Sequence, residues 1–112
     1  MKRDGDLAED QALSHLLARG CHLRERNFRC RFGEIDLIVA DGGTLVFVEV
    51  RKRSHTAFGN AADSITPSKQ RRIVAAARFY LSGRQVDAPC RFDAVLIDGG
   101  GRIEWMRDAF GA

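Results

Sequence analysis

Short runs of apolar residues, alternating or continuous, recur along the chain and predict strands. The clearest are GEIDLIVAD at 33–41 and TLVFVEVRKR at 44–53. Both faces of these runs are apolar, so the two strands are expected in the middle of a sheet. A weaker run at 21–29 predicts an outer strand, 91–98 predicts another central strand, and 102–108 predicts an edge strand.

Two other segments have apolar residues at helical spacing. In 6–19, DLAEDQALSHLLAR, the pattern places Leu13, Leu16 and Leu17 on the inward side, and Gly20 follows as a C-terminal stop.

The second helix begins with a recognisable cap. Thr66 is a preferred N-cap residue and Pro67 suits the first helical position, so a helix is expected over 67–82. The residues predicted to face inward are Ile73, Ala77, Tyr80 and Leu81. The element order is α-β-β-β-α-β-β, which predicts an α/β fold, and residues 1–112 are expected to form a single domain.

The two central strands each contain a carboxylate, and the turn between them sets how these meet. Gly42-Gly43 is a two-residue turn that accommodates positive φ at both positions. With this turn, Asp36 lies directly opposite Glu49. The same register places Glu34 opposite Arg51. Cross-strand Cβ atoms are about 4.5–5.5 Å apart, so the two carboxylates repel each other unless a cation lies between them.

A third carboxylate is expected near this pair. Glu9 precedes Leu13 by four residues and Leu16 by seven, so it lies along the inward stripe of the first helix. Mg²⁺ and Mn²⁺ prefer oxygen ligands and commonly take one or two carboxylates with water and a substrate phosphate. We therefore interpret Asp36 and Glu49, with Glu9 beside them, as a candidate metal site able to hydrolyse a phosphodiester.

Basic residues are concentrated rather than spread. The formal net charge is +3, from 18 basic and 15 acidic residues. Between positions 51 and 78 a single acid, Asp63, accompanies these basic residues: Arg51, Lys52, Arg53, Lys69, Arg71, Arg72 and Arg78. Cations in a first helical turn oppose the helix dipole, so those of the second helix suggest an anionic ligand such as phosphate. A second basic group precedes the first central strand and consists of Arg24, Arg26, Arg29 and Arg31. A solvated surface is the alternative for both groups.

Composition places the protein in a broad class. Hydrophobic residues make up 45% and charged residues 29% of the chain, as in ordinary globular proteins. The three widely spaced cysteines, Cys21, Cys30 and Cys90, fit reduced thiols better than disulfides. The N-terminal MKRDGDLAEDQ has no apolar signal segment, and uncharged apolar runs such as 45–48 and 73–77 are too short to cross a bilayer. We expect a cytoplasmic protein without a membrane partner.

Several segments, taken together, are more specific than any one alone. They are GEIDLIVAD at 33–41, VFVEVRKR at 46–53, Phe58-Gly59, SITPSKQRRI at 64–73 and RFDAVLID at 91–98. This combination resembles the YraN-like family of small bacterial proteins, over nearly the whole chain. That family is itself assigned by resemblance to the PD-(D/E)XK nuclease superfamily, near the archaeal Holliday junction resolvases. The resemblance implies a restriction endonuclease-like αβββαβ core, with a mixed central sheet flanked by helices.

The resemblance also implies roles for individual residues. Asp36 matches the PD-type aspartate and Glu49 the acid of the (D/E)XK tripeptide, so both would bind Mg²⁺ or Mn²⁺. The backbone carbonyl of Val50 would complete the protein ligands. Glu9, in the pattern GxxAExxA, matches the glutamate of the first helix.

One position departs from the family pattern. The third place of the tripeptide is Arg51, where the family usually has lysine. Arginine stays charged, so Arg51 can hold a phosphate or stabilise the transition state but cannot act as a base. Lys52 would reach the site only through a one-residue slip of the strand, and Lys69 of the second helix is a further candidate.

The expected function is that of a metal-dependent endonuclease acting on DNA, with branched or repair intermediates as candidate substrates. Arg51 would take part in catalysis, and the expected nucleic-acid contacts are Lys52, Arg53, Lys69, Arg71 and Arg72. The junction resolvases act as dimers, so a homodimer is a further expectation. The long connection at 54–65 is expected to flank the site.

Several alternatives remain at this stage. A non-catalytic nucleic-acid-binding module, favoured by Arg51, would keep the fold without cutting, and a structural partner in a larger repair complex is a third function. Asp36 and Glu49 would then form ion pairs with Arg51 and Arg53, and Glu9 would be a surface acid. Asp93, inside the apolar run at 91–98, needs a partner, either Arg91 or a cation of a helix.

Overall fold

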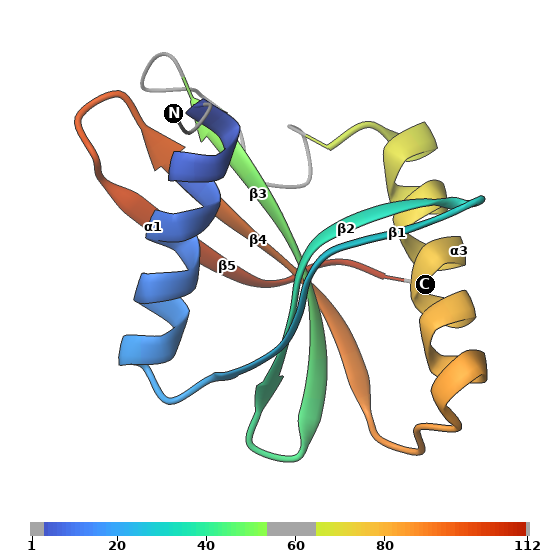
Figure 1. The fold of residues 1–112 in the computed structure, drawn as a ribbon. Helices are drawn as coiled ribbons and strands as arrows, with labels where there is room; N and C mark the ends of the chain where they lie inside the picture. The colour runs from blue at the N-terminus through green and yellow to red at the C-terminus, as the bar shows by residue number, and fades with distance from the viewer. Residues whose placement is uncertain (1–3, 54–64, 112) are drawn as a thin grey trace.

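The computed structural model describes residues 4–53 and 65–111. The helices and strands, shown in Figure 1, are α1 Asp4–Ala18, β1 His22–Cys30, β2 Gly33–Asp41, β3 Thr44–Arg53, α3 Pro67–Arg84, β4 Cys90–Asp98 and β5 Ile103–Phe110. The predicted element order is confirmed, and the predicted strand bounds agree with the observed ones within two residues.

The strands form one mixed sheet in the order β1-β2-β3-β4-β5. β3 and β4 run parallel, whereas the other neighbours are antiparallel. The chain needs a crossover to join parallel strands, and α3 lies within that crossover. Helix α1 covers one face of the sheet and α3 the other (Figure 1). The mixed α/β class is therefore confirmed, and the arrangement is compatible with a restriction endonuclease-like core.

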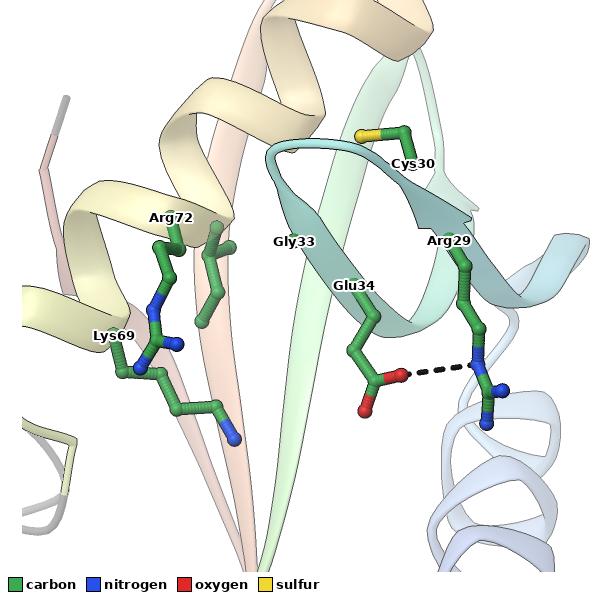
Figure 2. Close-up of a pocket in the computed structure, with 7 residues that line it drawn as sticks. Arg29, Cys30, Gly33, Glu34, Lys69 and Arg72 are labelled. Carbon is green, nitrogen blue, oxygen red and sulfur yellow. Dashed lines mark ion pairs between the residues drawn. The ribbon is translucent and has the colours of Figure 1, made fainter.

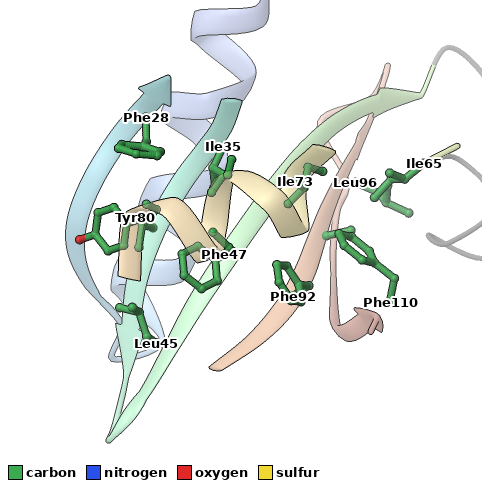
Figure 3. Close-up of a cluster of buried hydrophobic side chains, with 14 residues drawn as sticks. Phe28, Ile35, Leu45, Phe47, Ile65, Ile73, Tyr80, Phe92, Leu96 and Phe110 are labelled. Carbon is green, nitrogen blue, oxygen red and sulfur yellow. The ribbon is translucent and has the colours of Figure 1, made fainter. Parts of the chain in front are cut away.

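Each face of the sheet has its own apolar core. On the α3 face, shown in Figure 3, aromatic rings dominate: Phe47 stacks on Phe92 at 5.5 Å between centroids and meets Tyr80 edge-on at 6.0 Å. On the opposite face, α1 packs against the valines of β3, including Val46 and Val48. This double burial explains why β3 is apolar on both sides.

The inward stripe of α1 differs from the prediction. Ala8, Ala12 and Leu16 form the buried stripe, whereas Leu17, expected inward, is 46% exposed. Residues four apart share one side of a helix, and Leu17 is turned about 100° away from Leu16. The two alanines allow the helix to approach the sheet closely, and leucine spacing alone did not reveal them.

The hairpin of β2 and β3 follows the predicted register from Asp41–Thr44 to Leu37–Val48, with Gly42 at φ 61° in its turn. The described ladder between these strands ends at Leu37–Val48. The predicted pairing of Glu34 with Arg51 is wrong, because β2 continues alongside β1 at this end. Glu34 pairs instead with Arg29, at 3.0 Å between Oε2 and Nε. On β3, Arg51 pairs with Leu96 of β4.

Helix α3 starts as predicted. The side-chain oxygen of Thr66 accepts a hydrogen bond from the N–H of Lys69 at 3.1 Å, which confirms the cap. The helix extends to Arg84, two residues beyond the prediction, and Gln85 ends it in the left-handed conformation at φ 51°. No helix in the described part of the chain has both the length and the apolarity of a membrane span.

The unusual acid of β4, Asp93, has a structural explanation. It is fully buried, and Arg91, one of the two kinds of partner considered for it, lies 3.0 Å away between Nε and Oδ1. Trp105 Nε1 donates to Oδ2 at 2.8 Å, and the N–H of Asp108 donates to Oδ1 at 2.9 Å. A buried carboxylate needs this number of partners, and these bonds tie β5 to β4.

Candidate functional site

Asp36 and Glu49 meet just beyond the end of the hairpin ladder. There the N–H of Val50 donates to Asp36 Oδ2 at 2.8 Å, so a side chain replaces the next ladder bond. Glu49 is 3% exposed and Asp36 is half-buried. Burial and then the hydrogen bond and charge of Glu49 raise the pKa of Asp36 to about 8, against the weaker lowering effects of Val50 N–H and Lys69. Without a cation, the Asp36 carboxyl group therefore holds a proton at neutral pH.

Lys69 brings a positive charge from α3 to this pair. Its Nζ lies 2.9 Å from Glu49 Oε2. The contact is an ion pair without hydrogen-bond alignment, because Oε2 has no hydrogen-bond partner among the described residues although it is buried. Buried carboxylate oxygens are rarely left in this state. A metal ion bound to Glu49 Oε2 would therefore take the place of the Lys69 ammonium.

Glu9 lies close to the pair but is held by another residue. Arg26 Nε of β1 is 3.3 Å from Glu9 Oε1, and the same guanidinium contacts Asp10 at 2.6 Å. Burial and the negative charge of Asp36 raise the pKa of Glu9, while Arg26 and Asn27 lower it. The charge of Asp36 thus acts on Glu9, which belongs to α1 on the opposite face of the sheet from α3 and Lys69.

The donor set limits the kind of metal site that these residues can form. Within residues 4–53 and 65–111, no group of three or more His, Cys, Asp or Glu side chains lies close enough together to hold a metal ion. A closed zinc-type cage is therefore not formed there. Mg²⁺ and Mn²⁺ keep several waters and use one or two carboxylates, so Asp36 and Glu49 fit a hydrated cation that would replace the Lys69 contact with Glu49.

A basic cleft opens next to the acidic pair. It has a volume of about 330 Å³ and lies between α3 and the tip of the β1–β2 hairpin (Figure 2). Lys69 and Arg72 line it from α3, and Arg29 and Glu34 line it from the hairpin. Lys69 lines the cleft and also forms the ion pair with Glu49, so this one side chain connects the cleft with the acidic pair.

The residues predicted to contact nucleic acid do not all lie together. Lys69 and Arg72 line this cleft, whereas Arg71 lines a separate one with Arg78 on another side of α3. Arg51 is half-buried and Lys52 is exposed, both on β3. The side chain of Arg53 and the connection at 54–64 lie outside the described residues.

Two residues of the candidate site, Arg29 and Asn27, were not identified from the sequence. Arg29 shares the cleft with Arg72, although the chain had shown it only as part of a basic group. Asn27 interrupts β1 with a left-handed backbone at φ 55°. The pairing of β1 with β2 omits Asp36 at this point, and the Asn27 side chain contacts Glu9. An asparagine in a strand is the signal for such a left-handed position.

These features define an α/β protein with a carboxylate pair beside a basic cleft, the two sharing Lys69. Residues 8–97 match the model of the uncharacterised protein family UPF0102, to which the chain belongs. This is the YraN-like family indicated by the motifs.

Relatives in several bacteria share most of the chain. A UPF0102 protein of Ralstonia nicotianae is 58% identical over 112 residues, covering 96% of this chain and 85% of the relative. A UPF0102 protein of Nitrosomonas eutropha is 55% identical over 109 residues, covering 97% and 94%. One of Dechloromonas aromatica is 57% identical over 108 residues, covering 96% and 88%.

Proposed function

We propose that this protein is a metal-dependent endonuclease of the PD-(D/E)XK type that hydrolyses DNA phosphodiester bonds. The observation that carries the proposal is the pair of Asp36 and the buried Glu49, in which Glu49 Oε2 has no hydrogen-bond partner among the described residues and lies beside the Lys69 ammonium. A fold needs no such pair, because two adjoining buried carboxyl groups destabilise each other when both are ionised.

Each residue has a role in this proposal. Asp36 and Glu49 would hold Mg²⁺ or Mn²⁺, with the carbonyl of Val50 as a further ligand and Glu9 beside them. When bound, the cation would supply a Lewis acid for the phosphoryl oxygen and a nucleophilic water. Lys69 keeps a positive charge beside the reacting phosphate, where it stabilises developing negative charge.

Phosphate binding is the role of the remaining cations. Arg72 and Arg29 line the cleft and offer guanidinium groups that match phosphate geometry. Arg51 stands two residues after Glu49 on β3 and would contact the scissile phosphate. Lys52, Arg53 and Arg71 would contact the DNA backbone farther from the reaction.

One observation favours a second function, a non-catalytic nucleic-acid-binding module. Lys69 balances the charge of Glu49 at 2.9 Å, so the pair is partly neutralised without a cation. Arg51 cannot exchange a proton as the usual lysine does. In this alternative the basic cleft would bind DNA and the carboxylates would only support the fold.

Cleavage of labelled single-stranded, duplex, flapped and four-way-junction DNA with Mg²⁺ or Mn²⁺ tests the proposal. Asp36→Asn and Glu49→Gln should each lower cleavage by about two orders of magnitude or more, because they remove a charged ligand without changing side-chain size. Glu25→Gln, whose ion pair with Arg84 lies on β1 and α3, is the matched control and should cut normally.

Calorimetric titration with Mn²⁺ gives a readout that does not need activity. The native protein should bind the ion, and Glu49→Gln should lose that binding. Salt-sensitive DNA binding without cleavage or metal binding would replace the nuclease with the binding module. The expected homodimer stays a prediction, which light scattering with and without DNA tests.

A further inference from the structure

Two aromatic rings are exposed next to the candidate site. Phe32, in the turn between β1 and β2, is 40% exposed, and Phe79 on α3 is 43% exposed. Their ring centroids are 5.8 Å apart. Neighbouring exposed rings form an apolar surface of the kind that marks a binding site, whereas single exposed apolar residues do not.

The hairpin tip is held against α3, so these rings have fixed positions. A Cβ atom on Gly33 would lie only 3.1 Å from the backbone oxygen of Arg72, which shows how closely the strand approaches the helix. Phe28, buried in the core, supports Phe79 at 6.5 Å between centroids. The exposed rings are therefore part of a rigid surface rather than a loose turn.

Cations surround this aromatic surface. The guanidinium of Arg31 lies 4.9 Å from the centroid of Phe32. Arg72 precedes Phe79 by seven residues, which is two helical turns, so both lie on the same side of α3 about 10 Å apart. Lys69, one turn further back, reaches Glu49. Figure 2 shows Arg72 and Lys69 projecting from α3 opposite Arg29 of the hairpin.

A line of groups thus runs along α3 from the two rings, past Arg72, to the carboxylates. Rings combined with backbone-binding cations are the elements that bind nucleic-acid strands with unpaired bases. A continuous duplex conceals the faces of its bases, whereas a single strand or a flap offers them for stacking.

We propose that Phe32 and Phe79 form a stacking platform for unpaired DNA bases, and that the bound strand continues past Arg72 to Asp36 and Glu49. This inference rests on the proposed nuclease function and names its substrate class: single-stranded DNA, or DNA at a boundary between single and double strand. The platform binds the bases, while Arg29 and Arg72 bind the phosphates.

Fluorescence anisotropy tests the platform. Labelled single-stranded DNA and a duplex of equal length are titrated in EDTA, so that binding is measured without a divalent cation. Phe32→Ala and Phe79→Ala should each weaken single-strand binding by about 5- to 100-fold and change duplex binding less than about twofold. Phe32→Trp should keep the single-strand affinity, because it keeps an aromatic face.

Two controls separate stacking from other causes. Leu17→Ala on α1 removes a side chain with a similar exposure, 46%, and should change neither affinity. Phe32→Leu keeps an apolar side chain without a π-face and should behave like Phe32→Ala. Circular dichroism and thermal melting identify any variant that fails to fold, and the Phe32→Trp result then still tests the platform.

The outcomes separate this inference from the proposed function. Unchanged single-strand affinity in both alanine variants, or equal losses for single strand and duplex, overturns the platform even if the protein cuts DNA. Selective loss of single-strand binding supports the platform even if no cleavage occurs, and the nuclease proposal then fails alone.

Discussion

The Asp36 carboxyl group makes the stability of the metal-free protein depend on pH. Its folded-state pKa of about 8 lies above the ordinary value of 3.8, chiefly because of burial and then the neighbouring Glu49. Between these values the folded protein binds a proton that the unfolded chain releases. The contribution of this proton to the free energy of unfolding is fully present below about pH 4 and is lost as the pH rises through about 8.

Asp36→Asn should remove this dependence. Asparagine keeps an oxygen to accept the N–H of Val50 but does not ionise, so the variant should be the more stable protein at pH 8.5, by about 1–3 kcal/mol. Urea unfolding in EDTA from pH 5 to pH 9 measures this. Asp87→Asn, at an exposed site, should follow the native profile. Parallel profiles for native protein and Asp36→Asn would refute the raised pKa.

The ion pair between Lys69 and Glu49 has a second consequence for stability. Lys69→Gln leaves a buried carboxylate without its cation, so the free energy of unfolding should fall by about 1–3 kcal/mol at pH 7, less than for a fully buried pair because Lys69 is 34% exposed. Arg71→Gln in the same helical turn should cost less than about 0.5 kcal/mol. Equal effects of the two changes would contradict the pairing.

A double variant separates the ion pair from the general effect of losing a lysine. In Glu49→Gln/Lys69→Gln the buried charge is absent, so removing Lys69 should have little further effect on stability. Guanidinium denaturation of the four proteins completes the cycle, and additive losses would mean that the two side chains act independently.

At the scale of elements, the contact between the hairpin tip and α3 depends on one glycine. Gly33→Ala places a methyl group about 3.1 Å from the Arg72 carbonyl oxygen, and backbone atoms cannot move aside as a flexible side chain can. We expect a loss of about 1–3 kcal/mol in unfolding free energy.

Gly43→Ala is the matched control for Gly33→Ala. It lies in the other hairpin turn, with no atom within 4 Å of the new methyl group, and should cost less than about 1 kcal/mol. Thermal unfolding of both variants measures the difference. A similar melting temperature for the two would show that the tip does not press against α3.

The elements were largely predictable because their signals are local. Alternation, the Gly42-Gly43 turn and the Thr66-Pro67 cap each act within a few residues, and the hairpin register brought Asp36 close to Glu49 from sequence alone. The failures have tertiary causes. Leu17 is exposed because the alanines of α1 pack against the sheet in its place. Glu34 forms an ion pair with Arg29 because β2 pairs with β1 at that end.

The contact of Lys69 with Glu49 illustrates a different limit of prediction. Glu49 belongs to β3, whereas Lys69 belongs to the helix in the connection between β3 and β4. The sequence periodicity of a helix does not determine its position relative to the end of a strand. The sequence could identify Lys69 as a candidate but not its distance from Glu49, which depends on how α3 packs on the sheet.

At the scale of the whole molecule, the cations of α3 are divided between two sides, and this division predicts how salt affects DNA binding. Arg72 lines the basic cleft together with Lys69, whereas Arg71 lines a separate pocket. Arg72→Gln should weaken single-strand binding and lower the slope of log K against log salt by about one, because one phosphate contact is lost.

The same titration of Arg71→Gln provides the comparison. This variant should lower the affinity and the slope for single-stranded DNA less than Arg72→Gln does, because Arg71 lies outside the cleft and would contact the DNA backbone farther from the reaction. A larger effect from Arg71 than from Arg72 would place the bound strand on the opposite side of α3 and would count against the cleft.

The parallel pairing of β3 with β4 also determines the order in which the chain can fold. Partners across this pair are 45 positions apart, as for Leu45 with Cys90, whereas the turns joining β1, β2 and β3 are short. Closing a long loop costs more entropy, so the three-stranded meander should form before β4 docks. In a pulse-labelled hydrogen-exchange experiment, the amides of the meander should then become protected before those of β4.

Asp36 and Glu49 both belong to that meander, and Lys69 arrives only with the crossover. A folding intermediate made of the meander alone would therefore carry the two acids without their lysine. The late docking of α3 then completes the charge balance of the site and brings the hairpin tip and the helix together, so the cleft exists only in the fully folded molecule.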